Sequence, residues 1–195
     1  RHDIRHVVLE NCVFRMPDIY PGSVSGISIE SCDGSHVEDI TVRGIRMEKI
    51  QCPLYIVLNR RNGAHEPYSE DPDALYWGSV SSVRICDIEA ADAELPAILT
   101  GYTDVTKAWK PVRKAISDIG IKNYRVTYRD NQEILHLPAA FDEFLTEYPE
   151  SNAHGDVDAC GLWIRHADHV LLENIQITPR SANSREKIRL YDVNP

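Results

Sequence analysis

The sequence contains little positive charge and no long apolar run. Its 21 lysines and arginines are outnumbered by 30 aspartates and glutamates, so the formal net charge is -9 at pH 7 and the pI is near 5.3. Nucleic acids and anionic membrane surfaces attract basic faces, and this balance argues against both. No run approaches the roughly 20 apolar residues that a membrane-spanning helix needs. We therefore expect no nucleic-acid partner and no membrane partner.

Cysteine is scarce, and its spacing is not that of a metal site. The five cysteines include no C-x-x-C pair, so we predict no metal site and no cofactor. Cys12 and Cys86 fall inside predicted strands, where a small apolar core residue is expected. Cys32 and Cys52 fall in predicted loops, and the sequence leaves open whether a disulfide joins them.

One eight-residue pattern, by contrast, occurs five times. It reads apolar-x-apolar-x-(Asn/Gly/Asp)-apolar-x-apolar, and successive copies begin 33, 43, 36 and 51 residues apart. The copies are 7–14, 40–47, 83–90, 119–126 and 170–177. A short unit that recurs with insertions of variable length is typical of a solenoid.

Each copy predicts two strand segments joined at a corner. Apolar residues alternate with the two-residue period of a strand that buries one face. At the central Asn, Gly or Asp the alternation shifts by one position, which indicates a bend, and these residue types tolerate a left-handed backbone. We also expect corner asparagines such as Asn11 and Asn174 to stack in successive coils as a hydrogen-bonded ladder.

A second, shorter apolar strand follows the copies. The predicted second strands are 26–29, 53–56, 96–99, 161–164 and 187–190. Stacked coils of this kind form an all-β fold, a right-handed parallel β-helix of about five to six coils. A β-sandwich is the alternative, but it gives no reason for one corner pattern to recur. We predict a single β-helix domain over residues 1–195.

The pattern begins by residue 7, which leaves no room for a cap on the first coil. Because an uncapped β-helix end exposes strand edges and core, we expect this chain to be the C-terminal part of a longer β-helix. Two long insertions, 59–78 and 128–159, interrupt the repeat. Helical spacing of Phe141, Phe144 and Leu145 predicts a short helix near 139–146. Such loops shape the binding surface of a solenoid.

Residues between the apolar positions of the second strands are expected to face away from the coil core. Coil by coil, this outward column contains Ser28 and Glu30, Tyr55 and Val57, Ile98 and Thr100, Trp163 and Arg165, and Arg189 and Tyr191. Aromatic rings beside charged and polar groups suit a carbohydrate. An ordinary solvated sheet face is the alternative.

Several segments also carry a family resemblance. The first group is 25–31, which reads S-G-I-S-I-E-S, followed by 37–42, 45–47 and 53–56. In this order they resemble the running pattern G-I-R-I-K-S, V-x-N-I-T-F, I-x-M and P-I-x-I of glycoside hydrolase family 28, the polygalacturonases and their relatives. The segments 148–150, 161–166, 170–177 and 191–193 also look like bacterial members. The resemblance covers nearly the whole chain.

The resemblance implies an inverting glycosidase that acts on a pectic or related plant cell-wall polysaccharide. In such enzymes one carboxylic acid protonates the leaving oxygen and a carboxylate opposite activates water, with roughly 6.5–9.5 Å between them. The family's acidic motifs do not occur in this sequence, so the catalytic acids are expected upstream of Arg1. Glu30 is the only candidate within the chain.

Two positions depart from the family pattern. Ser28 and Glu30 stand where polygalacturonases are expected to hold a galacturonate carboxylate with Arg and Lys. A hydroxyl and an acid would not attract a uronate. A neutral or differently branched pectic glycan is therefore expected as the polysaccharide or oligosaccharide partner. The resemblance favours a secreted or periplasmic location, and a cytoplasmic one stays open.

Further binding residues are expected just after the predicted short strand 53–56. Asn59, Arg60 and Arg61 follow it directly, and paired arginines can clamp a carboxylate or ring hydroxyls. Loop charge balanced by Glu66, Glu70 and Asp71 is the alternative. The predicted substrate-binding residues are thus Ser28, Glu30, Tyr55, Asn59, Arg60, Arg61, Trp163 and Arg165.

Two other functions share the predicted fold. A polysaccharide lyase abstracts a proton from a uronate, often beside calcium, but the acidic cluster for the cation is missing. A non-catalytic β-helix would bind sugar without cleaving it. His166 and His169 have a metal-like spacing, but the sequence places no third ligand nearby, and we expect structural roles for both.

Overall fold

The computed structural model describes residues 3–16, 24–61, 77–105, 111–129, 137, 140–180 and 185–195. Its strands are β1 (Ile4–Glu10), β2 (Val13–Arg15), β3 (Ser25–Ser31), β4 (His36–Glu48), β5 (Cys52–Leu58), β6 (Ser79–Ala93), β7 (Ala97–Thr100), β8 (Tyr102–Asp104), β9 (Val112–Lys114), β10 (Ile116–Tyr128), β11 (Ala159–Pro179) and β12 (Glu186–Asn194). One 3-10 helix, η2, spans Ser151–His154. No helix in these ranges has the length and apolar character to cross a membrane.

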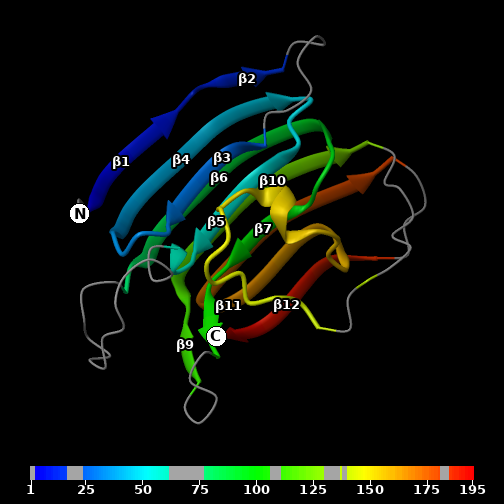
Figure 1. Ribbon diagram of the computed structural model, residues 1–195. Coiled ribbons are helices and arrows are strands. Elements are labelled where there is room, and N and C mark those ends of the chain that lie inside the picture. The colour runs from blue at the N-terminus through cyan, green and yellow to red at the C-terminus, as the bar shows by residue number, and fades with distance from the viewer. Residues whose placement is uncertain are drawn as a thin grey trace.

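The strands stack as the coils of a parallel β-helix (Figure 1). β1, β4, β6, β10 and the second half of β11 pair in parallel, and we call this row, together with β2, the corner sheet. β3, β5, β7, the first half of β11 and β12 form the second parallel row, which we call the column sheet. Five coils therefore follow one another, and the predicted all-β parallel β-helix is confirmed.

The register of the corner sheet follows the repeat in the sequence. Val7 faces Ile40, Ile40 faces Val83, Val83 faces Ile119, and Ile119 faces Val170. These are the first residues of the five copies. Equivalent positions therefore lie one strand apart, as parallel stacking of like coils requires.

The predicted corner residues do turn the chain. Asn11, Gly44, Asp87, Asn123 and Asn174 all have a left-handed backbone, with φ between 53° and 65°. Gly44 serves a second purpose, because a Cβ there would lie 2.8 Å from Asn11 Oδ1. The corner prediction is confirmed at every copy.

A second set of corners precedes each copy, and the repeat pattern did not reveal it. His6, Asp39, Ser82, Asp118 and His169 also have a left-handed backbone, with φ between 52° and 56°. Each stands directly before the first apolar residue of its copy. The sequence does carry a signal for these corners. An apolar residue stands three positions before the first apolar residue of each copy, and this spacing shifts the alternation just as the predicted corner does.

The coil interior is filled by apolar side chains from both sheets. Ile45, Leu54, Ile56 and Ile85 are completely buried there. Burial of a side chain of this size stabilises the fold by roughly 1.5–3 kcal/mol. Small residues start some short strands because the interior is tight: a Cβ at Gly26 would lie 2.5 Å from Met47 Sδ.

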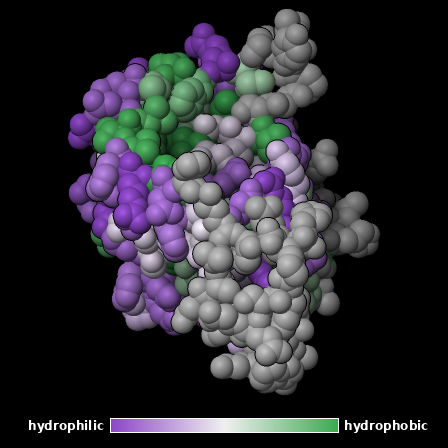
Figure 2. Space-filling view, turned by 60° about the vertical axis from the view of Figure 1, so that its left-hand side comes forward, coloured by the Kyte–Doolittle hydropathy of each residue, from purple (hydrophilic) through white to green (hydrophobic). Residues whose placement is uncertain are grey.

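Apolar side chains reach the surface at the N-terminal coil. Ile4, Val7, Val8 and Val13 are each at least 40% exposed. Figure 2, which brings this side of the molecule forward, shows a green apolar area among purple polar residues. The partners of Ile4 and Val7 one coil along, Val37 and Ile40, are buried because a strand packs on each side of them.

The helix predicted near 139–146 is wrong for the described part of that range. Residues 140–146 form irregular backbone, and Phe144 has a left-handed φ of 53°. The Leu145 carbonyl accepts a hydrogen bond from the Arg60 backbone N–H at 2.7 Å. Helical spacing misled because these backbone groups bond to the sheet beneath them and not to one another. The described helical turn of this insertion is η2.

The five cysteines are free thiols, and all lie within the described residues. Cys12 packs against the coil core, as predicted. Cys86 is half-buried and alternates with the buried Ile85, so its predicted core position is wrong. Cys32 and Cys52 are buried outside the coil interior, and burial raises the pKa of each to about 12. The disulfide between them is not formed.

Candidate functional site

The column sheet brings the predicted outward residues together in register. The first row across the strands is Ser28, Tyr55, Ile98, Trp163 and Arg189, and the second is Glu30, Val57, Thr100, Arg165 and Tyr191. Both rows face away from the coil core, because the residues between them fill it. The predicted column therefore exists as a continuous face of the solenoid.

A segment of the second insertion covers most of this face. We call residues 140–158 the strap, and Figure 1 shows it in yellow across β5, β7 and β11. Tyr55 is completely buried, Trp163 is 1% exposed and Arg165 is 8% exposed. The expectation of an open aromatic column is wrong at these positions, because a distant part of the chain returns over them.

The strap and the column sheet form a second apolar core. Its buried members are Cys32, Cys52, Tyr55, Val57, Ile98, Val157, Ala159 and Trp163. The Phe141 ring packs against the Trp163 indole with centroids 5.3 Å apart in an edge contact. Aromatic pairs in this geometry add to the stabilisation that burial provides. Trp163 and Tyr55 thus act as packing residues in this arrangement.

Hydrogen bonds join the strap to the end of β5. The Asn59 side-chain amide donates to the Glu147 carbonyl at 3.1 Å, and the Arg60 backbone N–H donates to the Leu145 carbonyl. Asn59 is only 1% exposed. Asn59 was predicted to bind sugar, but here its side-chain amide holds the strap.

The η2 turn attaches the second part of the strap to β3 and β5. The Ser151 hydroxyl donates to the Val24 carbonyl at 2.7 Å, just before β3. His154 Nε2 lies 3.0 Å from the Tyr55 hydroxyl, and the His154 ring stacks on Phe144 at 3.8 Å. Burial lowers the pKa of His154 to about 4, so the ring is neutral and can accept a hydrogen bond from the Tyr55 hydroxyl.

Glu143 anchors the first part of the strap. Its carboxylate pairs with the Arg165 guanidinium, lies 3.0 Å from His166 Nε2, and accepts a 2.6 Å hydrogen bond from the Thr103 backbone N–H. Arg165 also donates to the Asp142 carbonyl at 2.6 Å. Arg165 was predicted to bind substrate, and here its donors are engaged within the protein.

The same network continues to the last strand. His166 Nδ1 lies 2.6 Å from Asp192 Oδ2, and Arg113 pairs with both Asp192 and Asp168. Burial favours a higher pKa for Asp192, but hydrogen bonds from His166 and Arg113 outweigh it and lower that pKa. Within the described ranges, no group of three or more His, Cys, Asp and Glu side chains is arranged to hold a metal ion.

Both arginines after β5 are paired within the protein. Arg60 lies 2.6 Å from Asp104, whose side chain is 3% exposed. Arg61 donates two hydrogen bonds to Asp33, at 3.1 and 2.5 Å, and these raise the pKa of Arg61. The balancing residues that the sequence suggested, Glu66, Glu70 and Asp71, lie outside the described residues. Asp33 and Asp104 were missed because they are distant in sequence.

One end of the column remains open at β3. Ser28 is exposed, and its hydroxyl donates to the half-buried Glu30 carboxylate. The strap contributes Tyr148, which is 64% exposed, and the Arg61 guanidinium lies 5.4 Å from the centre of its ring. We call this set, completed by Asp33, the open end.

The charges of the open end surround one buried thiol. Burial raises the pKa of Cys32, the Glu30 and Asp33 carboxylates raise it further, and Arg61 opposes them. Glu30 and Asp33 belong to β3 and the turn after it, and Arg61 follows β5, so two segments of the chain bring these charges together. Together with the Tyr148 ring they can accept hydrogen bonds, donate them and stack on a flat apolar surface. Of this set, the repeat pattern pointed only to Ser28 and Glu30, and the position after β5 pointed to Arg61.

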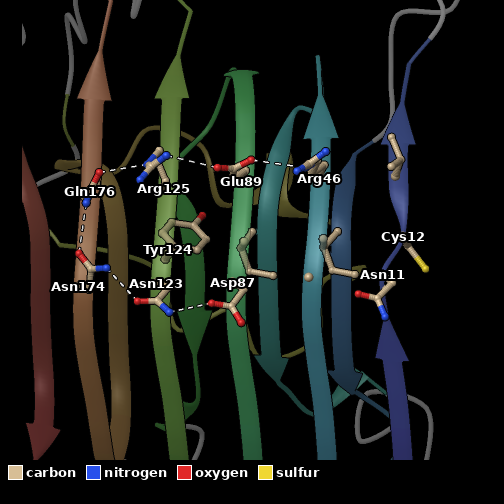
Figure 3. Close-up of a pocket in the computed structure, with 14 residues that line it drawn as sticks. Asn11, Cys12, Arg46, Asp87, Glu89, Asn123, Tyr124, Arg125, Asn174 and Gln176 are labelled. Carbon is tan, nitrogen blue, oxygen red and sulfur yellow. Dashed lines mark hydrogen bonds and ion pairs between the residues drawn. The ribbon is translucent and has the colours of Figure 1, made fainter.

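The outer face of the corner sheet carries a different kind of site, an open pocket of about 580 Å³ (Figure 3). Asn123 donates to Asp87 at 2.7 Å, Asn174 donates to Asn123 at 2.8 Å, and Gln176 donates to Asn174 at 3.2 Å. The predicted ladder is confirmed from Asn174 through Asn123 to Asp87, across three coils. It does not extend to Asn11, the other residue named for it, because the neighbour of Asn11 one strand along is Gly44, which has no side chain.

A charged row borders the ladder. Glu89 lies 3.6 Å from Arg46 and 3.3 Å from Arg125, and Arg125 donates to Gln176 at 3.1 Å (Figure 3). A second hollow of about 520 Å³ lies against the same Arg46, Glu89 and Arg125 side chains. Because these exposed groups already form ion pairs and hydrogen bonds with one another, we interpret this face as an ordinary solvated sheet face.

Comparison of the chain with family models, curated proteins and solved structures found no match. The likeness to glycoside hydrolase family 28 therefore stays a prediction from the sequence. The open end is the candidate site because it combines the exposed Ser28 and the half-buried Glu30 of the predicted column with the exposed Tyr148 ring and a second carboxylate, that of Asp33.

Proposed function

We propose that this β-helix binds a glycan at the open end and belongs to a glycoside hydrolase of the family 28 type. The substrate would be a neutral or branched pectic polysaccharide or a related cell-wall glycan. The observation that supports this is the position of the exposed Ser28 and the half-buried Glu30 on β3 of a parallel β-helix, near Asp33, whose partner Arg61 lies against the exposed Tyr148 ring.

The charge of the open end supports a neutral sugar. Glu30 and Asp33 both carry carboxylates there, whereas the Arg61 guanidinium is already bound to Asp33. A uronate carboxylate would meet like charges and no unpaired cation from this set. Hydroxyl groups, by contrast, can donate to carboxylates, and a sugar ring can stack on Tyr148.

The chemistry that we propose is inverting hydrolysis. By the resemblance, the catalytic acid and base would lie on coils that precede this chain, with Glu30 as the candidate within it. In that scheme the open end holds the sugar next to the scissile bond, and the two catalytic carboxyl groups stand roughly 6.5–9.5 Å apart. Glu30 would accept a hydrogen bond from a sugar hydroxyl.

An assay on pectic fractions tests the reaction class. The protein that contains this chain should release reducing ends without unsaturated products, and the 195-residue chain alone should be inactive. Unsaturated, ultraviolet-absorbing ends would instead establish a lyase, and binding without either product would establish a non-catalytic module. Turnover by the isolated chain would contradict the proposed position of the acids.

A pair of matched variants tests the site. Glu30→Gln should lower kcat/KM by about tenfold or more, because a hydrogen bond to a charged acceptor is lost. Glu89→Gln removes the same charge from the exposed row on the corner sheet and should leave kcat/KM unchanged. Equal effects of the two variants would return Glu30 to an ordinary solvated side chain.

A further inference from the structure

We propose that the strap closes one side of the glycan site, so that the site accepts the end of a glycan chain and not its middle. This inference rests on the proposed function and concerns how the ligand is limited in length. It follows from the contrast in burial along one row of the column sheet.

A ligand that runs along the column must cross the strands in the order of the coils. Adjacent strands are about 4.8 Å apart, so the next position after Ser28 is reached within a single sugar unit. That position is Tyr55, which is completely buried, and Ile98 and Trp163 beyond it are each 1% exposed. A chain that lies over β3 therefore meets the strap at β5.

The same block occurs along the second row. Glu30 is half-buried, whereas its neighbour Val57 is completely buried and Thr100 is 3% exposed. Arg165, the next residue in this row, is held by Glu143 of the strap. Neither row thus offers a free side chain between β3 and β12.

The strap is a fixed wall and not a loosely attached loop. Ser151 is completely buried, Val157 is 3% exposed and Phe144 is 4% exposed. The Leu145 carbonyl accepts a hydrogen bond from the Arg60 backbone N–H at the end of β5, and the Ser151 hydroxyl donates to the Val24 carbonyl just before β3. Moving it aside would uncover the second apolar core and break these hydrogen bonds together.

Tyr148 lies between these two points of attachment. Leu145 and Ser151 flank it in the sequence, and its ring is 64% exposed beside Arg61. A terminal sugar that reaches the wall can stack on this ring, whereas an internal sugar would need the strap's space for the next unit. Tyr148 is therefore the residue that we assign to recognition of the chain end.

Binding measurements on two preparations of one glycan test this inference. The probes are linear galactan, a neutral pectic glycan, and the same galactan cut to about one tenth of its length, titrated by mass into the protein that contains this chain. A chain-end site should reach half-saturation at about tenfold lower mass of the short probe, because the number of ends rises tenfold. A site open on both sides should reach it at a similar mass of either probe.

A matched pair of variants completes the test. Tyr148→Ala should raise the half-saturating concentration of the short probe about tenfold, because the stacking surface is lost. Leu171→Ala removes a side chain of nearly equal exposure, 65%, from the corner sheet and should change nothing. An unchanged affinity of Tyr148→Ala would overturn the assigned role of this ring.

The remaining outcomes separate the two proposals. Half-saturation that follows total sugar mass would overturn the closed site and leave glycan binding standing. Failure of either probe to bind would overturn the proposed function and, with it, this inference.

Discussion

The two sheets of the solenoid share the same alternation of inward and outward side chains, but the outer face of one is exposed and that of the other is largely buried. On the corner sheet, the outward Glu89 side chain is 54% exposed. On the column sheet, the outward Tyr55 is completely buried beneath the strap. In a solenoid, a side chain that faces away from the coil core is exposed only if no insertion returns over it.

The composition of the two faces explains the difference. Outward amides and charges of the corner sheet, such as Asn123 and Arg125, bond to their equivalents one strand along and can stay in water. Outward Tyr55, Ile98 and Trp163 are large and apolar, and covering them contributes about 25 cal/mol for each Å² removed from water. An apolar outward row thus indicates a covered face as readily as a sugar-binding one.

The largest expected effect is on the covered face. Trp163→Ala should lower the free energy of unfolding by about 3–5 kcal/mol, because it leaves a cavity in the second apolar core. Val13→Ala, at a residue that is 68% exposed on the corner sheet, should change it by no more than about 0.5 kcal/mol. Urea denaturation of both variants measures the contrast.

A third variant separates packing from hydrogen bonding. The Trp163 indole N–H has no hydrogen-bond partner among the described residues, so Trp163→Phe should lose clearly less than Trp163→Ala. Losses below about 1 kcal/mol for Trp163→Ala would show that the strap does not pack on the column sheet in solution.

A smaller loss of stability is expected when the charge of Glu143, which anchors the strap, is removed. Glu143→Gln leaves Arg165 without its carboxylate and removes one of the two carboxylates at His166 in a largely buried network, and we expect a loss of about 3 kcal/mol. Glu89→Gln breaks two ion pairs in the exposed row and should cost less than about 1 kcal/mol. Thermal unfolding of the two variants, side by side, decides whether the networks differ; equal losses would remove the distinction.

Acid should weaken the covered face before it affects the Arg84–Asp118 ion pair of the corner sheet. Burial holds the pKa of His154 at about 4, below its ordinary value of 6.5, so the unfolded chain binds a proton in this window that the folded chain does not. This contribution to stability is complete above pH 6.5 and is lost as the pH falls through 4. Asp118, whose pKa is lowered by its hydrogen bond from Arg84, titrates below this window.

Unfolding measured from pH 7 to pH 4 checks this dependence. His154→Gln should flatten the decline, because the new side chain does not titrate. His6→Asn, at an exposed histidine of the corner sheet, should retain it. A decline that persists in His154→Gln would assign it to other groups.

The smallest expected effect is in the ladder. Asn123→Ala puts alanine, which tolerates a left-handed backbone less well than asparagine, at a φ of 53°. It also removes the hydrogen bonds to Asp87 and Asn174. Together these changes should lower the free energy of unfolding by about 1–2 kcal/mol. Asn123→Gly loses the same bonds but adopts this backbone more easily and should cost less. Equal losses in urea denaturation would show that the amide bonds, and not the backbone, carry the effect.

Much of the fold was predictable because it depends on local alternation. Each shift of phase marked a corner, as at Gly44, and the distance between copies gave the register of the corner sheet. The second corner, as at Asp39, escaped notice although the same kind of shift marks it. The outward column was also predicted correctly as a row, because strand alternation alone decides which side chains leave the core.

The candidate site was less predictable because its residues meet only through long-range contacts. Asp33 reaches Arg61, and Tyr148 lies beside the same arginine, from separate segments. Helical spacing around Phe144 even suggested the wrong backbone. Whether the substrate-binding residues named from the sequence contact a sugar stays a prediction.

The sequence by itself therefore determined the coils, their corners and their register, since these follow from the two-residue period and from the residue types that tolerate a left-handed backbone. Only the tertiary structure decided which outward face stays in water. The physical reason is that covering a face requires an irregular segment to return across several coils, and its path depends on anchors such as Glu143 and Ser151 that have no periodicity to read. The strap leaves Ser28 open and buries Tyr55, which is one strand away.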